Sequence, residues 1–339
     1  MSCPDTAVCR GYHTSSAGIA RKSHPGGASL ALGLLLRQRG IPPTIYELRS
    51  KLTPQELAKP SGMLDLHDES GLRVMRECGL WDSFQAAVGD CSEACRVLNP
   101  QSTVLHTDEG ELASRPEITR NALTKLLIEN LPSDFVKWNH KTTGPFYGGA
   151  QLVTVTVRNS HLVELNGSGT LYALGGGNGI MTHRGPQDSI RHWAKAAALE
   201  GKSAAEVKMT LLSDDNLFSK WARWEHCTDA TLVGDAAHLM TPWGGEGVNM
   251  ALWDSLDLEH ALGGVLEAED AAAWQAALEP RFSEYEEAML LRAKEKAEER
   301  AKNKDMFLSE NGGQAMADMF KMFEDMEGGN WGFVNQRPD

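Results

Sequence analysis

A glycine-rich stretch in the last third of the chain holds residues whose types and spacing could do chemistry. Ala230–Gly234 is an apolar run that predicts a strand, and it leads into the acidic Asp235. Pro242–Asn249 follows, with three glycines directly before a predicted helix. The unpaired N–H groups at a helix start and the positive end of the helix dipole stabilise negative charge, and glycines let the backbone approach a flat ligand. The pattern therefore indicates a binding site for an anionic cofactor.

This stretch resembles the signature of single-component FAD-dependent aromatic monooxygenases. Gly-Asp-Ala-Ala-His at 234–238, then a proline and Gly-x-Gly-x-Asn at 245–249, match that signature, and the likeness continues along the helix to Leu262. The resemblance implies that the aspartate binds the ribityl and ribose hydroxyls of FAD, and that the proline and glycines lie beside the isoalloxazine ring. The cofactor-binding residues expected here are Asp235, Pro242, Gly247, Val248 and Asn249.

Three residues outside this stretch are expected to contribute to the same cofactor site. Glu47 ends a predicted strand, where a carboxylate can bind the adenosine ribose. The segment Gly62–His67 is similar to one in the tetracycline-degrading branch of these monooxygenases, in which the aspartate, here Asp65, borders the flavin and the nicotinamide. Arg120 opens a predicted helix that resembles the family's, and the resemblance implies charge-assisted hydrogen bonds from Arg120 to the FAD phosphates or ribityl chain.

The reaction that the resemblance implies is hydroxylation of an aromatic or polyketide-like small molecule, with FAD as cofactor and NADPH and O2 as co-substrates. NADPH would reduce the flavin, O2 would add at C4a, and the resulting hydroperoxide would hydroxylate an electron-rich ring. Because the cofactor carries the oxidising chemistry, the protein needs no acid–base pair, and the sequence indicates no catalytic residue and no metal ligand. His238 is therefore not expected to act as a general base, although it follows Asp235 closely.

Two segments depart from the family pattern. Lys22 and His24 stand where the first two glycines of the phosphate loop would be, so only the third, Gly27, remains. An Asp-Gly motif that contacts FAD and NADPH in relatives is absent after Trp138–Lys141. These departures keep two alternatives open: a truncated or degenerate, non-catalytic remnant or binding protein, and a nicotinamide (NAD(P))-dependent dehydrogenase built on the same βαβ unit.

The elements that must position these residues follow from hydrophobic periodicity. Gly26–Gly40 predicts a buried helix with basic residues in its last turn, and Ile41–Glu47 predicts the strand after it, so the pair forms the second half of a nucleotide-binding βαβ unit. After Gly247 the chain is expected to be mostly helical, with one long amphipathic helix from Arg281 onward. The remaining predictions are helices at 71–80 and 119–131, strands at 152–157, 171–174 and 179–182, and an apolar helical stripe at 316–326.

We therefore expect an α/β protein with a Rossmann-like FAD-binding domain of the GR2 type, a smaller β-sheet domain for the substrate and a long C-terminal helix. The FAD-binding domain is expected to be formed by two separate stretches of the chain, 26–142 and 226–262, with a shortened substrate sheet at 143–225 between them. A poorly ordered segment is expected at 1–25, and a helical region at 263–339.

Composition limits the class of partner. A formal net charge of −13 disfavours nucleic acid and anionic membranes, because phosphate binding needs clustered Lys and Arg. The longest apolar stretch, Ala28–Leu36, is too short for a bilayer, which takes about 20 residues, and the first residues lack the order of a secretory signal. Six cysteines in such a chain favour reduced thiols, including the closely spaced Cys91 and Cys95. We expect a cytoplasmic monomer that acts on a small molecule.

Overall fold

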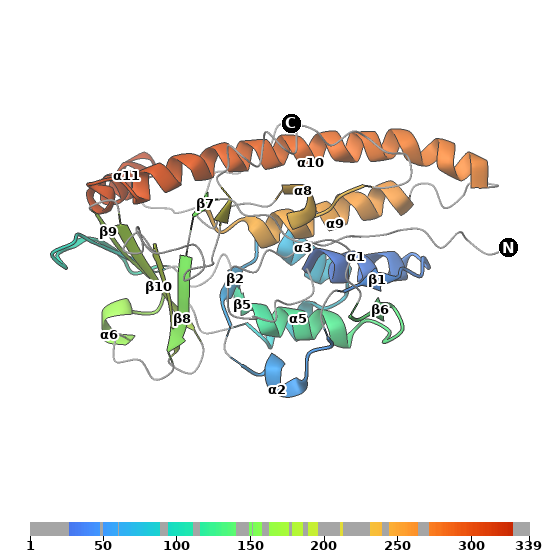
Figure 1. Ribbon diagram of the computed structural model, residues 1–339, viewed down its shortest axis with the longest axis horizontal. Coiled ribbons are helices and arrows are strands. Elements are labelled where there is room, and N and C mark those ends of the chain that lie inside the picture. Colours follow the sequence, from blue (N-terminus) through green and yellow to red (C-terminus); the bar gives the residue numbers. More distant parts are fainter. Residues whose placement is uncertain are drawn as a thin grey trace. The chain divides into compact units, whose positions relative to one another are not determined.

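The computed structural model describes residues 27–47, 50–59, 61–88, 94–110, 116–139, 149–150, 152–157, 163–175, 178–185, 189–195, 211–212, 231–238, 244–263 and 271–327. The chain divides into two compact units (Figure 1). The first takes in residues up to Asp90, Ala113–Leu152 and Ala198–Ala301. The second takes in Cys91–Leu112, Val153–Ala197 and the residues from Lys302 onward. The predicted poorly ordered segment 1–25 lies outside the described residues.

The first unit is mainly helical, with short two-stranded ribbons between the helices. Its described helices are α1 (Gly27–Gln38), α2 (Pro54–Leu57), α3 (Gly71–Glu77), α4 (Trp81–Gln85), α5 (Arg120–Glu129), α8 (Asp235–His238), α9 (Gly247–Gly263) and most of α10 (Ala271–Phe307). Its ribbons are the parallel pair β1 (Ile45–Tyr46) and β6 (Val136–Lys137), and the antiparallel pairs β2 (Met63–Asp65) with β5 (Glu117–Thr119) and β7 (Gly149–Ala150) with β12 (Leu211–Leu212).

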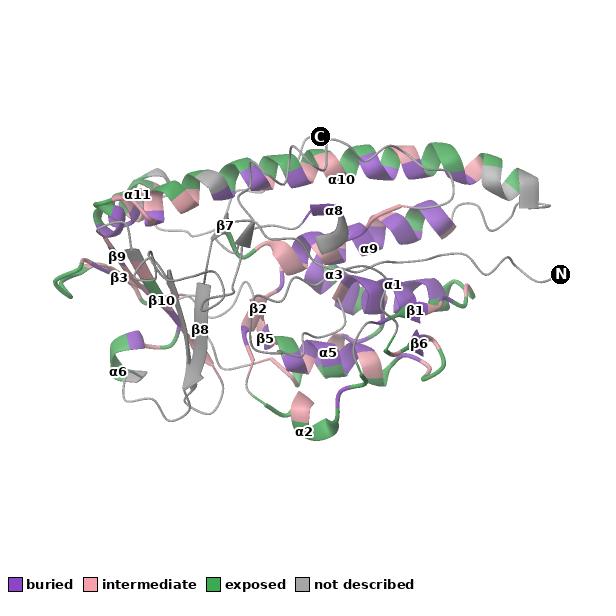
Figure 2. Cartoon of the chain, viewed as in Figure 1, coloured by how far each residue is buried: buried purple, intermediate pink, exposed green. Residues whose placement is uncertain are grey.

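Helix α1 forms the centre of this unit, as Figure 2 shows by its continuous buried surface. One face, with Leu30 and Leu34, packs into a core shared with α3, α4, α5 and α9. The opposite face, with Leu32 and Leu36, packs into a second core shared with α9 and α10. A helix that is apolar all round must be buried, and each leucine removed from water contributes about 1.5–3 kcal/mol. The helix predicted at 26–40 is thus confirmed, as are those predicted at 71–80 and 119–131.

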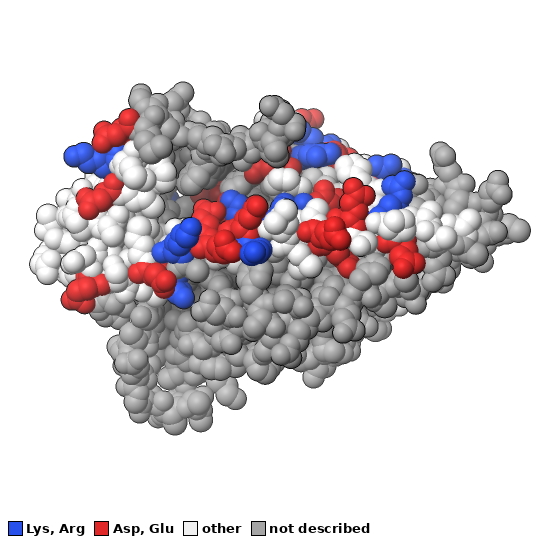
Figure 3. Space-filling view, turned by 90° about the horizontal axis from the view of Figure 1, so that it is seen from above, with Lys and Arg blue, Asp and Glu red and all other residues white. Residues whose placement is uncertain are grey.

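Helix α10 covers the second core with one face only. Leu278, Phe282 and Met289 are buried at helical spacing, whereas the outer face is exposed (Figure 2). The space-filling view of this side shows Lys and Arg interspersed with Asp and Glu (Figure 3). The long amphipathic helix predicted from Arg281 is confirmed, but it begins ten residues earlier, at Ala271, and passes through Pro280, which is exposed.

The strand predicted at Ala230–Gly234 is wrong for the described residues of that run, because Thr231–Val233 are not in a strand. Side chains of α10 take the place of a neighbouring strand. The Tyr285 hydroxyl donates to the Leu232 carbonyl at 2.7 Å, and the Thr231 hydroxyl donates to a carboxylate oxygen of Glu286 at 2.6 Å. An apolar run whose pattern predicts a buried strand can therefore form hydrogen bonds with a helix instead.

The second unit is a six-stranded sheet with helices. The strand order is β4-β3-β9-β10-β11-β8, in which β3 and β9 are parallel and the β3–β4, β9–β10 and β10–β11 pairs are antiparallel. The elements are β3 (Cys95–Leu98), β4 (Val104–Asp108), β8 (Leu152–Val157), α6 (Val163–Asn166), β9 (Thr170–Gly175), β10 (Asn178–Gly185), β11 (Ser189–Lys195) and α11 (Gly312–Glu327). The strands predicted at 152–157, 171–174 and 179–182 are confirmed.

Helix α11 packs on this sheet. It confirms the helix predicted from the apolar stripe at 316–326, and the stripe contributes to packing. Met316 and Ala317 are buried, and the Phe320 ring stacks on that of His106 in β4 at 4.9 Å. A Cβ on Gly313 would lie 2.8 Å from the Leu98 carbonyl oxygen, so the start of α11 can approach the sheet only because a glycine is there. None of the described helices combines the length and the apolar character that crossing a membrane requires.

Candidate functional site

Two helices of the first unit, α1 and α9, lie side by side (Figure 1). Contacts near both of their ends show that they run in the same direction. Ala28, near the start of α1, and Ala251, near the start of α9, both pack against Gly234. A Cβ added to Gly234 would lie 3.4 Å from the Cβ of Ala28 and 3.2 Å from the Cβ of Ala251. Near the other ends, Arg39 pairs with Glu259. The positive ends of both helix dipoles therefore lie on the same side of the unit.

Both helices begin with a glycine that has open space around it. Among the described residues beyond the helix's own backbone, a Cβ added to Gly27 or to Gly247 would meet no atom within 4 Å. The first N–H groups of a helix have no partner inside the helix, so each start can donate hydrogen bonds to an anion placed in that space. Two such starts side by side fit a long anionic cofactor that carries charge at more than one point, which agrees with the expectation of FAD.

The turn at Gly234 is held by a buried aspartate in α9. Gly234 has φ +60°, a conformation that favours glycine, and its N–H donates to Oδ2 of Asp254 at 2.9 Å. The same oxygen lies 2.5 Å from Nε2 of His238, and Oδ1 accepts from Arg292 at 3.2 Å. Asp254 is fully buried. The network fixes the backbone that leads into Asp235.

This network explains two positions that the sequence left without a role. His238 has Asp254 as a buried partner, which gives it a role in holding the Gly234 turn. Asp254 itself was missed, although one signal was available: it lies four residues from both Met250 and Leu258, on the same apolar face of the helix. A buried carboxylate on an apolar helix face requires partners, and those partners are the preceding glycine turn and α10.

Asn249 connects α9 to the segment that carries Asp65. Its side chain is buried; Oδ1 accepts from the His67 N–H at 3.0 Å and from the Ser70 hydroxyl at 3.2 Å, and Nδ2 donates to the Asp65 carbonyl at 2.9 Å. The side-chain amide is thus engaged by protein atoms. Any contact from position 249 to a cofactor would come from the main chain.

The Asp65 carboxylate lies beside the turn that opens α9. A Cβ on Gly245, which has φ +69°, would be 3.8 Å from Asp65 Oδ1. Asp65 Oδ2 lies 3.1 Å from Nε2 of His67. The structure thus brings Asp65, Gly247 and Asn249 together, while Val248 packs against the first core.

The structure describes the other predicted cofactor-binding residues less completely. Glu47 follows β1, is buried, and donates its N–H to the Lys137 carbonyl at 2.9 Å. Arg120 opens α5 with an exposed side chain, and its N–H donates to the Gly62 carbonyl, one residue before β2, at 2.8 Å. Asp235 is the first residue of α8, but its side chain lies outside the described residues, as does all of Pro242.

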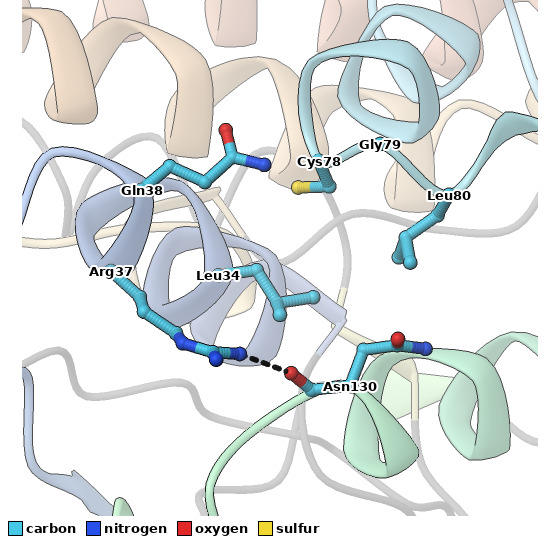
Figure 4. Close-up of a pocket in the computed structure, with 7 residues that line it drawn as sticks. All are labelled: Leu34, Arg37, Gln38, Cys78, Gly79, Leu80 and Asn130. Carbon is cyan, nitrogen blue, oxygen red and sulfur yellow. Dashed lines mark hydrogen bonds between the residues drawn. The ribbon is translucent and has the colours of Figure 1, made fainter.

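A cavity of about 310 Å³ lies in the first unit (Figure 4). It is lined by residues from the ends of α1, α3 and α5: Leu34, Arg37, Gln38, Cys78, Gly79, Leu80 and Asn130. Helix C-termini are negative and do not attract an anion. Burial, followed by the nearby Glu77 charge, raises the pKa of the Cys78 thiol to about 12, which keeps the thiol unreactive. This cavity is therefore not a counterpart of the cofactor site.

One group of three possible metal ligands occurs among the described residues, formed by Glu77, Glu259 and His260. Glu77 is already paired with Arg73 at 2.6 Å, and Glu259 with Arg39. Two guanidinium groups cancel the negative charge that would attract a cation. The ion pairs with Arg73 and Arg39 therefore account for this group of side chains without a metal ion.

A family profile described as an FAD binding domain matches residues 192–283, which contain α8 and α9. The chain is similar to monooxygenase asqM of Emericella nidulans, with 25% identity over 424 residues that cover 86% of this chain and 96% of asqM. Because this chain has only 339 residues, asqM carries stretches without a counterpart here.

Two solved structures show the same fold. HpxO of Klebsiella pneumoniae, complexed with FAD and uric acid, has a TM-score of 0.60 and 14% identity, over 89% of this chain and 91% of HpxO. Tetracycline destructase Tet(55) has a TM-score of 0.59 and 15% identity, over 90% of this chain and 95% of Tet(55). At this identity the likeness concerns the fold.

Proposed function

We propose that this chain is an FAD-dependent aromatic monooxygenase that binds FAD at the starts of α1 and α9. It would hydroxylate an aromatic small molecule, with NADPH as reductant and O2 as oxygen source. The observation that carries the proposal is the pair of parallel helix starts, each opening on a glycine with free space. The start of α9 lies within the segment that resembles the family signature.

In this proposal the described residues bind and orient the cofactor. The start of α1 holds the diphosphate, and the buried carboxylate of Glu47 binds the adenosine ribose. The start of α9 faces the region of the flavin ring that becomes negative on reduction, with Asp65 beside it. Asp235 takes the ribityl hydroxyls and Arg120 the phosphates or ribityl chain. FAD, when bound, supplies the oxidising chemistry.

The proposed substrate is an aromatic or polyketide-like compound. HpxO was solved with uric acid, and Tet(55) is a tetracycline destructase. Both names refer to ring compounds, which supports a ring substrate for this chain as well. The protein's share of catalysis is then to hold the ring near the flavin and to exclude water.

The test is a visible spectrum of the purified protein, followed by titration with FAD. Flavin bands near one equivalent, together with NADPH oxidation, are the expected result. A folded protein that takes up no FAD at high micromolar concentration would refute the proposal. A colourless protein that nevertheless reduces or oxidises a substrate with NAD(P) would indicate a dehydrogenase instead.

The second candidate function is that of a non-catalytic relative of these enzymes, which keeps the parallel helices α1 and α9. Two observations favour it: Lys22 and His24 replace the first two glycines of the phosphate loop, and asqM contains stretches that are missing here. Bulky side chains at the first two positions hinder approach of the diphosphate to the backbone. Uptake of FAD without NADPH oxidation, or no uptake at all, would distinguish this candidate from the enzyme.

A further inference from the structure

The residue between Asp65 and the start of α9 is a histidine with carboxylates on both sides. His67 Nε2 lies 3.1 Å from Asp65 Oδ2, and Nδ1 lies 3.5 Å from Glu246 Oε2 and 3.7 Å from Glu69 Oε1. The side chain is 13% exposed. Nε2 makes a hydrogen bond, whereas the two Nδ1 contacts are at ion-pair distance. A positive charge on the ring would be attracted to all three carboxylates, so the geometry suits the charged ring.

Glu246 is held from two sides. Besides His67, it accepts from Lys296 Nζ of α10 at 3.2 Å. Burial lowers the pKa of Lys296, but Glu246 and Glu299 together outweigh burial, so the pKa is raised and the lysine stays charged. Alternating charges thus run from Asp65 through His67, Glu246 and Lys296 to Glu299.

This line of charges passes the point where α9 begins. Glu246 immediately precedes Gly247, and Asp65 lies against Gly245. Without a cation between them, two carboxylates would repel each other and would place negative charge where an anionic ligand is to bind. The group that lies between them is His67, which is a cation when its ring is protonated.

We propose that His67 is a positioning residue: its protonated ring holds Asp65 and Glu246 together and keeps the Gly244–Gly247 turn in the form that receives the anionic cofactor. The inference rests on the proposed function for the identity of the ligand, whereas the holding of the turn is a property of the protein alone. Among the described residues, the charged groups that face the ring are Asp65 of β2, Glu69 of the following turn and Glu246, with Lys296 of α10 behind Glu246.

The first test uses the FAD-free protein. Amide hydrogen exchange of residues 244–249 is compared between the wild type and His67→Gln at pH 6 and pH 9. We expect exchange about tenfold faster in the variant at pH 6 and equal rates at pH 9, where the wild-type ring is neutral as well. His260→Gln, at an exposed position near the far end of α9, is the matched control and should follow the wild type at both pH values.

The second test measures the FAD dissociation constant of the same proteins. Weakening of about tenfold by His67→Gln at pH 6, with convergence at pH 9, supports the positioning role. Equal exchange in both proteins at pH 6 overturns it, and so does an equal loss at both pH values, which would indicate ordinary packing. Exchange as expected in a wild-type chain that binds no FAD would support the positioning role and refute the proposed function.

Discussion

Replacing Gly247 by alanine separates cofactor binding from folding. Among the described residues beyond the helix's own backbone, a Cβ at this position meets no atom within 4 Å, and the backbone is not in the left-handed region. Alanine is favoured over glycine in helices by about 0.5–1 kcal/mol. The FAD-free variant should therefore be as stable as the wild type, or more stable by up to about 1 kcal/mol. Urea unfolding followed by circular dichroism measures this free energy.

The same methyl group should weaken FAD binding if the flavin lies against the start of α9. Forcing an extra carbon into a close contact costs about 1–3 kcal/mol, which corresponds to an affinity about 5 to 150 times lower. Fluorescence titration with FAD gives the dissociation constant. His260→Ala, an exposed position in the same helix at its far end, should leave the constant unchanged.

Two results would refute this reasoning. If Gly247→Ala binds FAD as tightly as the wild type, the flavin does not pack on the start of α9. If the variant unfolds at a lower urea concentration, the space next to Gly247 is filled by protein, and the start of α9 is not open to a ligand.

The remaining predictions concern the supporting residues. Asp254→Ala leaves the Gly234 turn and Arg292 without a buried partner and should cost about 3–5 kcal/mol in urea unfolding; a loss below about 1 kcal/mol would show that the network is dispensable. Asp235→Ala should release bound flavin while leaving the circular dichroism spectrum unchanged, and retention at unchanged affinity would count against its role. Burial raises the pKa of the Cys78 and Cys95 thiols to about 12, so both should resist alkylation at pH 8 until the protein unfolds. Because these folded-state pKa values are raised, their contribution to stability is complete below about pH 9 and declines as the pH rises towards 12; urea midpoints that stay constant between pH 9 and 11 would contradict this.

The helices were predictable because their signals are local. Gly26–Gly40 contains an apolar run that only Ser29 and Gly33 interrupt, with basic residues and glycine at its end. Thr119 caps α5 by accepting from the Ala122 N–H. The start of α10 was not predictable in the same way, since Pro280 reads as a helix boundary. A proline on the exposed side of a helix that is held by its other face need not end it.

The β-structure was less predictable because pairing depends on distant residues. Strands β3 and β4 were not predicted at all; β3 owes its place to parallel pairing with β9, with Cys95 opposite Thr170. The apolar run at 231–233 was predicted as a strand, yet Tyr285 and Glu286 of α10 satisfy it. Whether such a run joins a sheet is decided by which partner is near, and one sequence does not contain that information.

The cofactor site itself was predicted from a motif, and the structure shows what the motif encodes. Among its described side chains, His238, Asn249 and Asp254 have protein partners. Gly234 is favoured by its φ and by the close approach of Ala251 in α9. These positions specify the parallel placement of α1 and α9. What is left for a ligand is the open space at Gly247 and the N–H groups of the helix starts. The motif therefore determines the placement of the two helices more strongly than it determines the ligand. A chain could keep the motif after losing the ability to bind FAD. The affinity of the Gly247→Ala variant for FAD is for this reason more informative than the presence of the motif.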